Sequence, residues 1–244
     1  SLMSFAVLKK RGVQGHYNPE RSGITRDMNF FLVTFGLACT AMFIPHDNST
    51  IRAVFSFGMV FIYFIYVLMT IRASADLVND GHATEAEGGM FLNRVGIPTN
   101  MTTIIIQLLI GLGLLVAGAE GFIHGIQQAA PILGISALML SLMIVPIATE
   151  LPEKVNSILW IRRHKDTLAF GNITGAMVFQ GTLLPAIGIS LTPWTPQPAV
   201  LLGIVVTLLA AAWLRLMLAR GQLRVWHLWV NGALYVAYLS AMLL

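Results

Sequence analysis

Long apolar stretches are the feature of this sequence that most limits what it can fold into. Seven stretches are each long enough to cross a bilayer, which takes about 20 residues of helix. They lie at 28–45, 51–71, 102–126, 131–161, 168–191, 199–218 and 225–244. Only 11% of the residues are charged, whereas the surface of a soluble domain needs about a quarter. We therefore predict an all-α, polytopic membrane helix bundle with seven spans.

The basic residues divide unevenly between the loops on the two faces of such a bundle. Of the 15 Lys and Arg, all except Arg52 and Lys154 fall on the face that holds the N-terminal segment. Positive residues are retained on the cytoplasmic side of a membrane. This face is therefore predicted to be cytoplasmic and the C-terminus external. The membrane is predicted to be a bacterial inner membrane. The net charge of +4 then reflects topology, and no nucleic-acid partner is expected.

A polar segment separates the second predicted span from the third. Residues 73–100 carry four acidic side chains and are predicted to form a cytoplasmic linker between two bundles. This linker separates residues 1–72, predicted to hold the tail of a truncated span and two membrane helices, from residues 101–244, predicted to hold five membrane helices.

Four ionisable residues lie inside the predicted spans, namely Glu120, Glu150, Glu153 and Lys154. A charge at mid-membrane costs at least about 2.5 kcal/mol, so such residues are candidates for function. In a helix, Lys154 lies one turn from Glu150 and can neutralise it, which leaves Glu153 as the uncompensated carboxylate. A structural alternative is a Glu–Lys pair that only joins two helices, but it leaves the second glutamate unexplained.

The two glutamates flank Pro152, which has no N–H and frees the carbonyls of Ala148 and its neighbours. Carboxylate and carbonyl oxygens are the ligands that hard cations such as Na⁺ or Ca²⁺ prefer. The following span offers a facing stripe, because Asn172, Ala176 and Gln180 recur every four residues on one helix face. The sequence therefore predicts a cation site between these two spans.

Two motifs carry this pattern: Ala-Thr-Glu-Leu-Pro-Glu at 148–153 and Gly-Asn-Ile-Thr-Gly-Ala-Met-Val-Phe-Gln at 171–180. Together they resemble the second alpha repeat of the cation/calcium exchanger superfamily, the family of sodium/calcium exchanger membrane domains, and place that repeat at 141–190. The resemblance implies ten helices in two inverted halves, with the ion site at their interface. It thereby implies that residues 1–72 are the end of the first half and residues 101–244 the second half. It also implies cation antiport by alternating access.

By this resemblance Glu153 matches the essential carboxylate of the family, Thr149 a neighbouring ligand, and Asn172 the amide of the second motif. The sequence also departs from the family pattern, because Glu150 replaces a Ser and Gln180 replaces an Asn or Asp. Ala176 and Met177 likewise stand where the family often has Ser and Asn. The transported ions are therefore left open, as Ca²⁺ or another cation moving against Na⁺ or H⁺. The predicted metal site comprises Ala148, Thr149, Glu150, Glu153, Asn172 and Gln180.

No second copy of the acidic motif occurs in residues 1–100. We therefore expect a missing N-terminal first alpha repeat as a partner, besides the lipid bilayer and the transported inorganic cations. No cofactor and no enzymatic activity are expected, since no Ser/His, paired-Asp or zinc constellation lies at membrane depth. The alternatives are a non-transporting fragment and a seven-helix receptor-like membrane protein. The last span has no lysine for a retinal Schiff base, which disfavours a photoreceptor.

Overall fold

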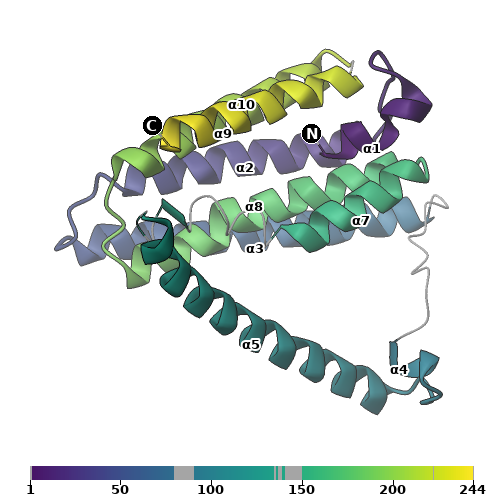
Figure 1. Ribbon diagram of the computed structural model, residues 1–244, viewed down its shortest axis with the longest axis horizontal. Helices are drawn as coiled ribbons and strands as arrows, with labels where there is room; N and C mark the ends of the chain where they lie inside the picture. The colour runs from purple at the N-terminus through teal and green to yellow at the C-terminus, as the bar shows by residue number, and fades with distance from the viewer. Residues whose placement is uncertain are drawn as a thin grey trace. The chain divides into compact units, whose positions relative to one another are not determined.

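The computed structural model describes residues 2–79, 91–134, 136, 139–140, 150–221 and 223–243. Over these ranges the chain is helical and contains no strand; a single β-bridge pairs His16 with Arg224. The helices are labelled in Figure 1: α1 (Leu2–Arg11), α2 (Arg21–Ala41), α3 (Ser49–Asn79), α4 (Phe91–Arg94), α5 (Met101–Leu133), α7 (Leu151–Arg162), α8 (Asp166–Leu191), α9 (Pro198–Ala219) and α10 (Val225–Leu243). The predicted all-α class is confirmed.

The chain divides into two compact units, Ser1–Ser74 with Thr149–Leu244, and Ala75–Ala148. The second unit contains α4 and α5, which are joined where the backbone N–H of Leu92 donates to the side-chain oxygen of Gln107 at 3.0 Å. The first unit contains the remaining helices, including most of α3. It holds the second motif and the acidic motif from Thr149 onward.

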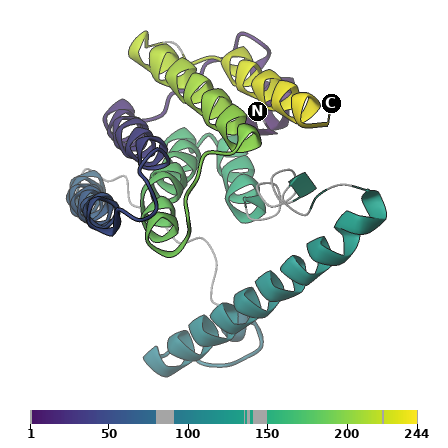
Figure 2. The same cartoon turned by 90° about the vertical axis from the view of Figure 1, so that its left-hand side faces the viewer.

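Helix α8 has the central place in the first unit. It packs against α2 on one side and α7 on another, while α9 packs against α2 and α10, and α1 against α7 and α10. Figure 2 views several of these helices nearly end-on. The seam between α2 and α8 is tight, because a Cβ on Gly181 would lie 2.7 Å from the ring of Phe31. The absence of a side chain at Gly181 permits this approach.

Four helical segments in the described part of the chain are long and apolar enough to cross a membrane: Ser49–Ser74, Met101–Leu133, Asp166–Leu191 and Val200–Ala219. They correspond to the second, third, fifth and sixth predicted spans. Their outward side chains are largely apolar and exposed, as expected for helices that face lipid. The full count of seven spans, the inverted repeat and the boundaries of the two halves and their linker stay predictions.

Several predicted boundaries are wrong. Helix α2 begins at Arg21, not at residue 28, because the carboxylate of Glu20 caps it by accepting from the N–H groups of Ser22 and Gly23, each at 2.6 Å. Hydropathy alone places the boundary too late, since a capped polar first turn is still helical. At its other end α2 stops at Ala41, four residues before the predicted end of the span.

The predicted loop between the third and fourth spans is also wrong, because it lies inside α5. This helix runs through Pro131 and ends at Leu133, where Gly134 adopts the left-handed conformation at φ 69°. Helix α3 likewise continues to Asn79, beyond the predicted span and into the predicted linker. In the fourth predicted span, residues 141–149 lie outside the described residues, and α7 supplies its second part.

We predict that Gly181→Ala destabilises the protein. The added methyl would overlap the buried ring of Phe31, and overpacking of this kind costs about 1–3 kcal/mol. The melting temperature in detergent should therefore fall. Gly36→Ala on α2 is the matched control, because a Cβ there meets nothing within 4 Å. Equal melting temperatures for the two variants would contradict the packing described for this seam.

Candidate cation site

The acidic motif forms the start of α7. Glu150 is the residue before the helix and Pro152 lies in the first turn, where a missing N–H costs no hydrogen bond. Glu153 follows in the same turn, where the helix dipole favours a negative charge. Pro152 is therefore compatible with the start of this helix. The two residues before Glu150, Ala148 and Thr149, lie outside the described residues.

The second motif lies on α8, and its amide side chains face the acidic motif. The Nδ2 of Asn172 donates to the backbone carbonyl of Glu153 at 3.0 Å and to the hydroxyl of Ser157 at 3.1 Å. The Ser157 hydroxyl is fully buried and donates to the carbonyl of Ala169 at 3.1 Å. Asn172 thus joins the two helices at the level of Glu153.

Gln180 lies two turns after Asn172 on the same face of α8, and its amide also donates to the acidic segment. Its Nε2 donates to the carboxylate of Glu150. The predicted four-residue stripe on α8 therefore does bring both amides against the segment 150–153. Glu150 and Gln180 both depart from the family pattern, and the two departures are related. The added carboxylate accepts a hydrogen bond from the longer amide side chain. The predicted neutralisation of Glu150 by Lys154 stays a prediction.

Glu153 carries the most informative polar atom of this region. Its Oε2 is buried and has no hydrogen-bond partner among the described residues. Leaving a buried carboxylate oxygen without a donor is costly, so this atom is the candidate cation ligand. Within the described ranges no group of three or more His, Cys, Asp or Glu is placed to hold a metal ion. Whether the predicted residues bind an ion stays a prediction.

Sequence reasoning missed a buried charge on the other side of α8. Asp27 on α2 is 4% exposed and accepts a hydrogen bond from the hydroxyl of Thr174 at 2.7 Å. The predicted span begins one residue after it, which left Asp27 in a loop. The signal was present in the sequence, because Ile24, Met28 and Phe31 recur at helical spacing around it and all three are buried.

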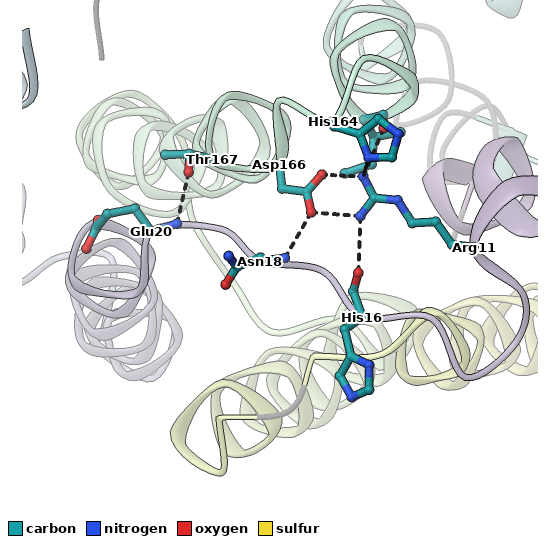
Figure 3. Close-up of polar contacts among 8 residues, drawn as sticks. Arg11, His16, Asn18, Glu20, His164, Asp166 and Thr167 are labelled. Carbon is teal, nitrogen blue, oxygen red and sulfur yellow. Dashed lines mark hydrogen bonds and ion pairs between the residues drawn. The ribbon is translucent and has the colours of Figure 1, made fainter. Parts of the chain in front are cut away.

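The turn between α7 and α8 is fixed by a buried ion pair, shown in Figure 3. Both terminal nitrogens of Arg11 on α1 bond the carboxylate of Asp166, each at 2.7 Å, and the two side chains are 10% and 7% exposed. The backbone N–H of Asn18 also donates to Asp166 at 2.9 Å. The N–H of Glu20 donates to the hydroxyl of Thr167 at 2.9 Å. The first turn of α8 is thus bound to α1 and the segment that follows it.

A phenol ring completes this cluster. The guanidinium of Arg11 lies 5.3 Å from the centre of the Tyr17 ring, which meets Phe170 edge-on at 5.3 Å. Burial raises the pKa of the Tyr17 phenol, so the ring stays neutral beside the ion pair. Tyr17 therefore adds packing and a cation–π contact without adding charge.

At the opposite end of α8 lies Arg52, near the start of α3, which is one of the two basic residues that depart from the charge asymmetry. It is 5% exposed and donates to the carbonyl of Pro193 at 2.9 Å, and also to the carbonyls of Ile189 and Thr192. A cation at a helix C-terminus satisfies carbonyls that lack helical partners and matches the dipole. Arg52 therefore caps α8.

Hydrogen bonds thus join the acidic segment at the start of α7 to the amide stripe on α8. Residues 103–244, more than half of the chain, match the sodium/calcium exchanger protein family, and the chain belongs to that family. The predicted resemblance to the cation/calcium exchanger superfamily is confirmed.

Particular relatives agree with this assignment. CaxA of Alkalimonas amylolytica, named as a candidate antiporter, is 34% identical over 96 residues, which is 39% of this chain and 30% of CaxA. MaX1 of Methanosarcina acetivorans, named as a sodium/calcium exchanger, is 29% identical over 93 residues, which is 38% of this chain and 27% of MaX1. These matches span less than a third of either relative.

A solved structure shares the fold. The crystal structure of the H⁺/Ca²⁺ exchanger CAX superposes with a TM-score of 0.74 at 17% identity, covering 100% of this chain and 60% of CAX. At this identity the likeness concerns the arrangement of the helices alone.

We predict that Arg11→Ala destabilises the first unit strongly. Removing one partner of a buried pair leaves the other charge uncompensated, at a cost of about 3–5 kcal/mol. Thermal unfolding in detergent should show a large drop in melting temperature. The control is Lys10→Ala, the exposed neighbour on the same helix, which should leave the temperature unchanged. A similar loss in both variants would mean that the ion pair does not hold this turn.

Proposed function

We propose that this protein exchanges cations across a membrane by alternating access, moving Ca²⁺ or another cation against Na⁺ or H⁺. The observation that carries this proposal is the buried oxygen of Glu153 that lacks a hydrogen-bond donor. The membership of the sodium/calcium exchanger family supports it, as do the names of the two relatives.

Each side chain of the site has a distinct part in the proposed exchange. Glu153 supplies the negative oxygen that replaces water around the ion, as hard cations require. Asn172 uses its amide N–H₂ to hold the backbone of Glu153 and the hydroxyl of Ser157, which leaves its Oδ1 to coordinate. Ala148 and Thr149 would add oxygens from the chain just before α7.

The pair formed by Glu150 and Gln180 bears on the counter-ion. An additional carboxylate at the site provides one more group that can take up or release a proton. Its hydrogen bond from Gln180 holds this carboxylate at the start of α7, three residues before Glu153 in the sequence. H⁺ is therefore a candidate counter-ion beside Na⁺, and separate H⁺ and Na⁺ gradients distinguish the two.

The setting of the protein follows from its apolar helices. Four segments suited to crossing a membrane support an integral membrane protein that works in contact with lipid. We propose the inner membrane of a bacterium, with the cluster of Arg11 on the cytoplasmic side and the C-terminus outside, in accord with the uneven distribution of basic residues. The proposed activity is transport, with no enzymatic step and no cofactor. A first alpha repeat would complete the site.

We predict that Glu153→Gln abolishes transport. The amide keeps the shape of the side chain but removes the charge that binds the cation. The full-length protein, including the first alpha repeat, would be reconstituted in vesicles, and Ca²⁺ uptake measured under a Na⁺ or an H⁺ gradient.

Uptake should fall to background in Glu153→Gln and persist in the control Asp47→Asn, which neutralises an exposed carboxylate between α2 and α3. Normal uptake by Glu153→Gln would remove this residue from the mechanism. Absence of uptake by the unaltered protein under both gradients would overturn the proposed exchange of Ca²⁺ for these ions.

A further inference from the structure

Asp27 is a buried charge that the proposed cation site does not use. One carboxylate oxygen accepts from the hydroxyl of Thr174 at 2.7 Å. The other accepts from the hydroxyl of Tyr66 at 3.2 Å and from the guanidinium of Arg26 at 3.1 Å. Each of these partners donates a hydrogen bond, which suits an ionised carboxylate. Asp27 thereby connects three helices, α2, α3 and α8.

The position of Thr174 relates this contact to the proposed site. Thr174 follows Asn172 by two residues, so their side chains lie about 200° apart around α8. Asn172 bonds to α7 on one side, and Thr174, which is 1% exposed, bonds to α2 on the other. Asp27 therefore binds α8 on the side roughly opposite to the side that carries Asn172.

A second polar contact between α2 and α8 shows that neutral side chains are sufficient to join these two helices. The hydroxyl of Thr182 donates to the hydroxyl of Thr34 at 2.7 Å, and both residues are 0% exposed. Two neutral hydroxyls are thus enough to join α2 and α8 at a point about two helical turns from Thr174. A carboxylate costs more to bury than a hydroxyl. Helix packing by itself therefore does not account for a carboxylate at Asp27.

The Tyr66 hydroxyl, which donates to Asp27, also faces Gly175, the residue after Thr174. A Cβ on Gly175 would lie 3.6 Å from this hydroxyl. A rotation of α8 about its own axis would break the bond between Asp27 and Thr174. It would also move the amide of Asn172 away from the carbonyl of Glu153.

We propose that Asp27 is a positioning residue for cation exchange. Its carboxylate sets the rotation of α8 and so holds Asn172 against the segment that carries Glu153. This inference rests on the proposed function of Glu153 and Asn172. In this proposal Asp27 acts through its hydrogen bonds, because each of its oxygens already accepts from a side chain of the protein.

The first test compares two matched substitutions on α8 in the full-length protein. Thr174→Val removes the hydroxyl that Asp27 binds, and Thr182→Val removes a hydroxyl two turns away on the same seam. Ca²⁺ uptake by vesicles should show a KM raised about tenfold in Thr174→Val, with Vmax unchanged. Thr182→Val should keep the KM of the unaltered protein, and the two variants should have similar melting temperatures.

Substitutions of the carboxylate itself complete this test. Asp27→Ala should raise the KM as Thr174→Val does, whereas Asp27→Asn keeps an oxygen for the Tyr66 hydroxyl and should recover part of the affinity. An unchanged KM in both Thr174→Val and Asp27→Ala would overturn the inference while leaving the proposed exchange intact. Absence of uptake by the unaltered protein would overturn the proposed function, and this inference with it.

A double-mutant cycle tests whether Asp27 acts through Asn172. The apparent affinity for Ca²⁺ would be measured from the rise in melting temperature with Ca²⁺ concentration, which requires no flux. In the Asn172→Ala background, Thr174→Val should cause no further loss of affinity. An equal loss in both backgrounds would show that the two residues act independently and would also overturn the inference.

Discussion

A polar side chain between helices that face lipid must find its partner inside the protein, because the bilayer core offers none. Helix α8 follows this constraint from end to end. Every one of its polar side chains has a partner on another element: Asp166, Thr167, Asn172, Thr174, Gln180, Thr182 and Ser190. On α7, by contrast, the buried Oε2 of Glu153 has no donor among the described residues. This contrast supports our proposal that Glu153 binds the cation.

The two sides of α8 have different chemistry. Toward α7 it presents amides, whose N–H groups hold the acidic motif and whose oxygens suit a cation. Toward α2 it presents hydroxyls and small residues, which permit the close approach at Gly181. At its ends, Asp166 pairs with Arg11 and Arg52 takes up the terminal carbonyls. A helix restrained at both ends and along both sides can hold an ion ligand in a fixed orientation.

The helical class and the contact between the two motifs could be predicted from the sequence, because both depend on local patterns. Apolar runs of bilayer length specify membrane helices, and the four-residue recurrence of Asn172 and Gln180 specifies a common face. The role of Asp27 could not be predicted in this way. Apolar residues at helical spacing around it indicate a buried face, but its partners Thr174 and Tyr66 are distant in sequence, and hydropathy placed it before the span. The start of the fourth predicted span at residue 131 lies inside α5, which continues to Leu133, because hydropathy does not mark where a helix ends.

The most direct test of this account is a crystal structure of the full-length protein with Sr²⁺ or Ca²⁺ bound. The account predicts anomalous density about 2.3–2.6 Å from Oε2 of Glu153, with the Asn172 side chain still bonded to the carbonyl of Glu153. Density only at another location, with Oε2 of Glu153 paired to an ammonium or facing bulk solvent, would contradict it.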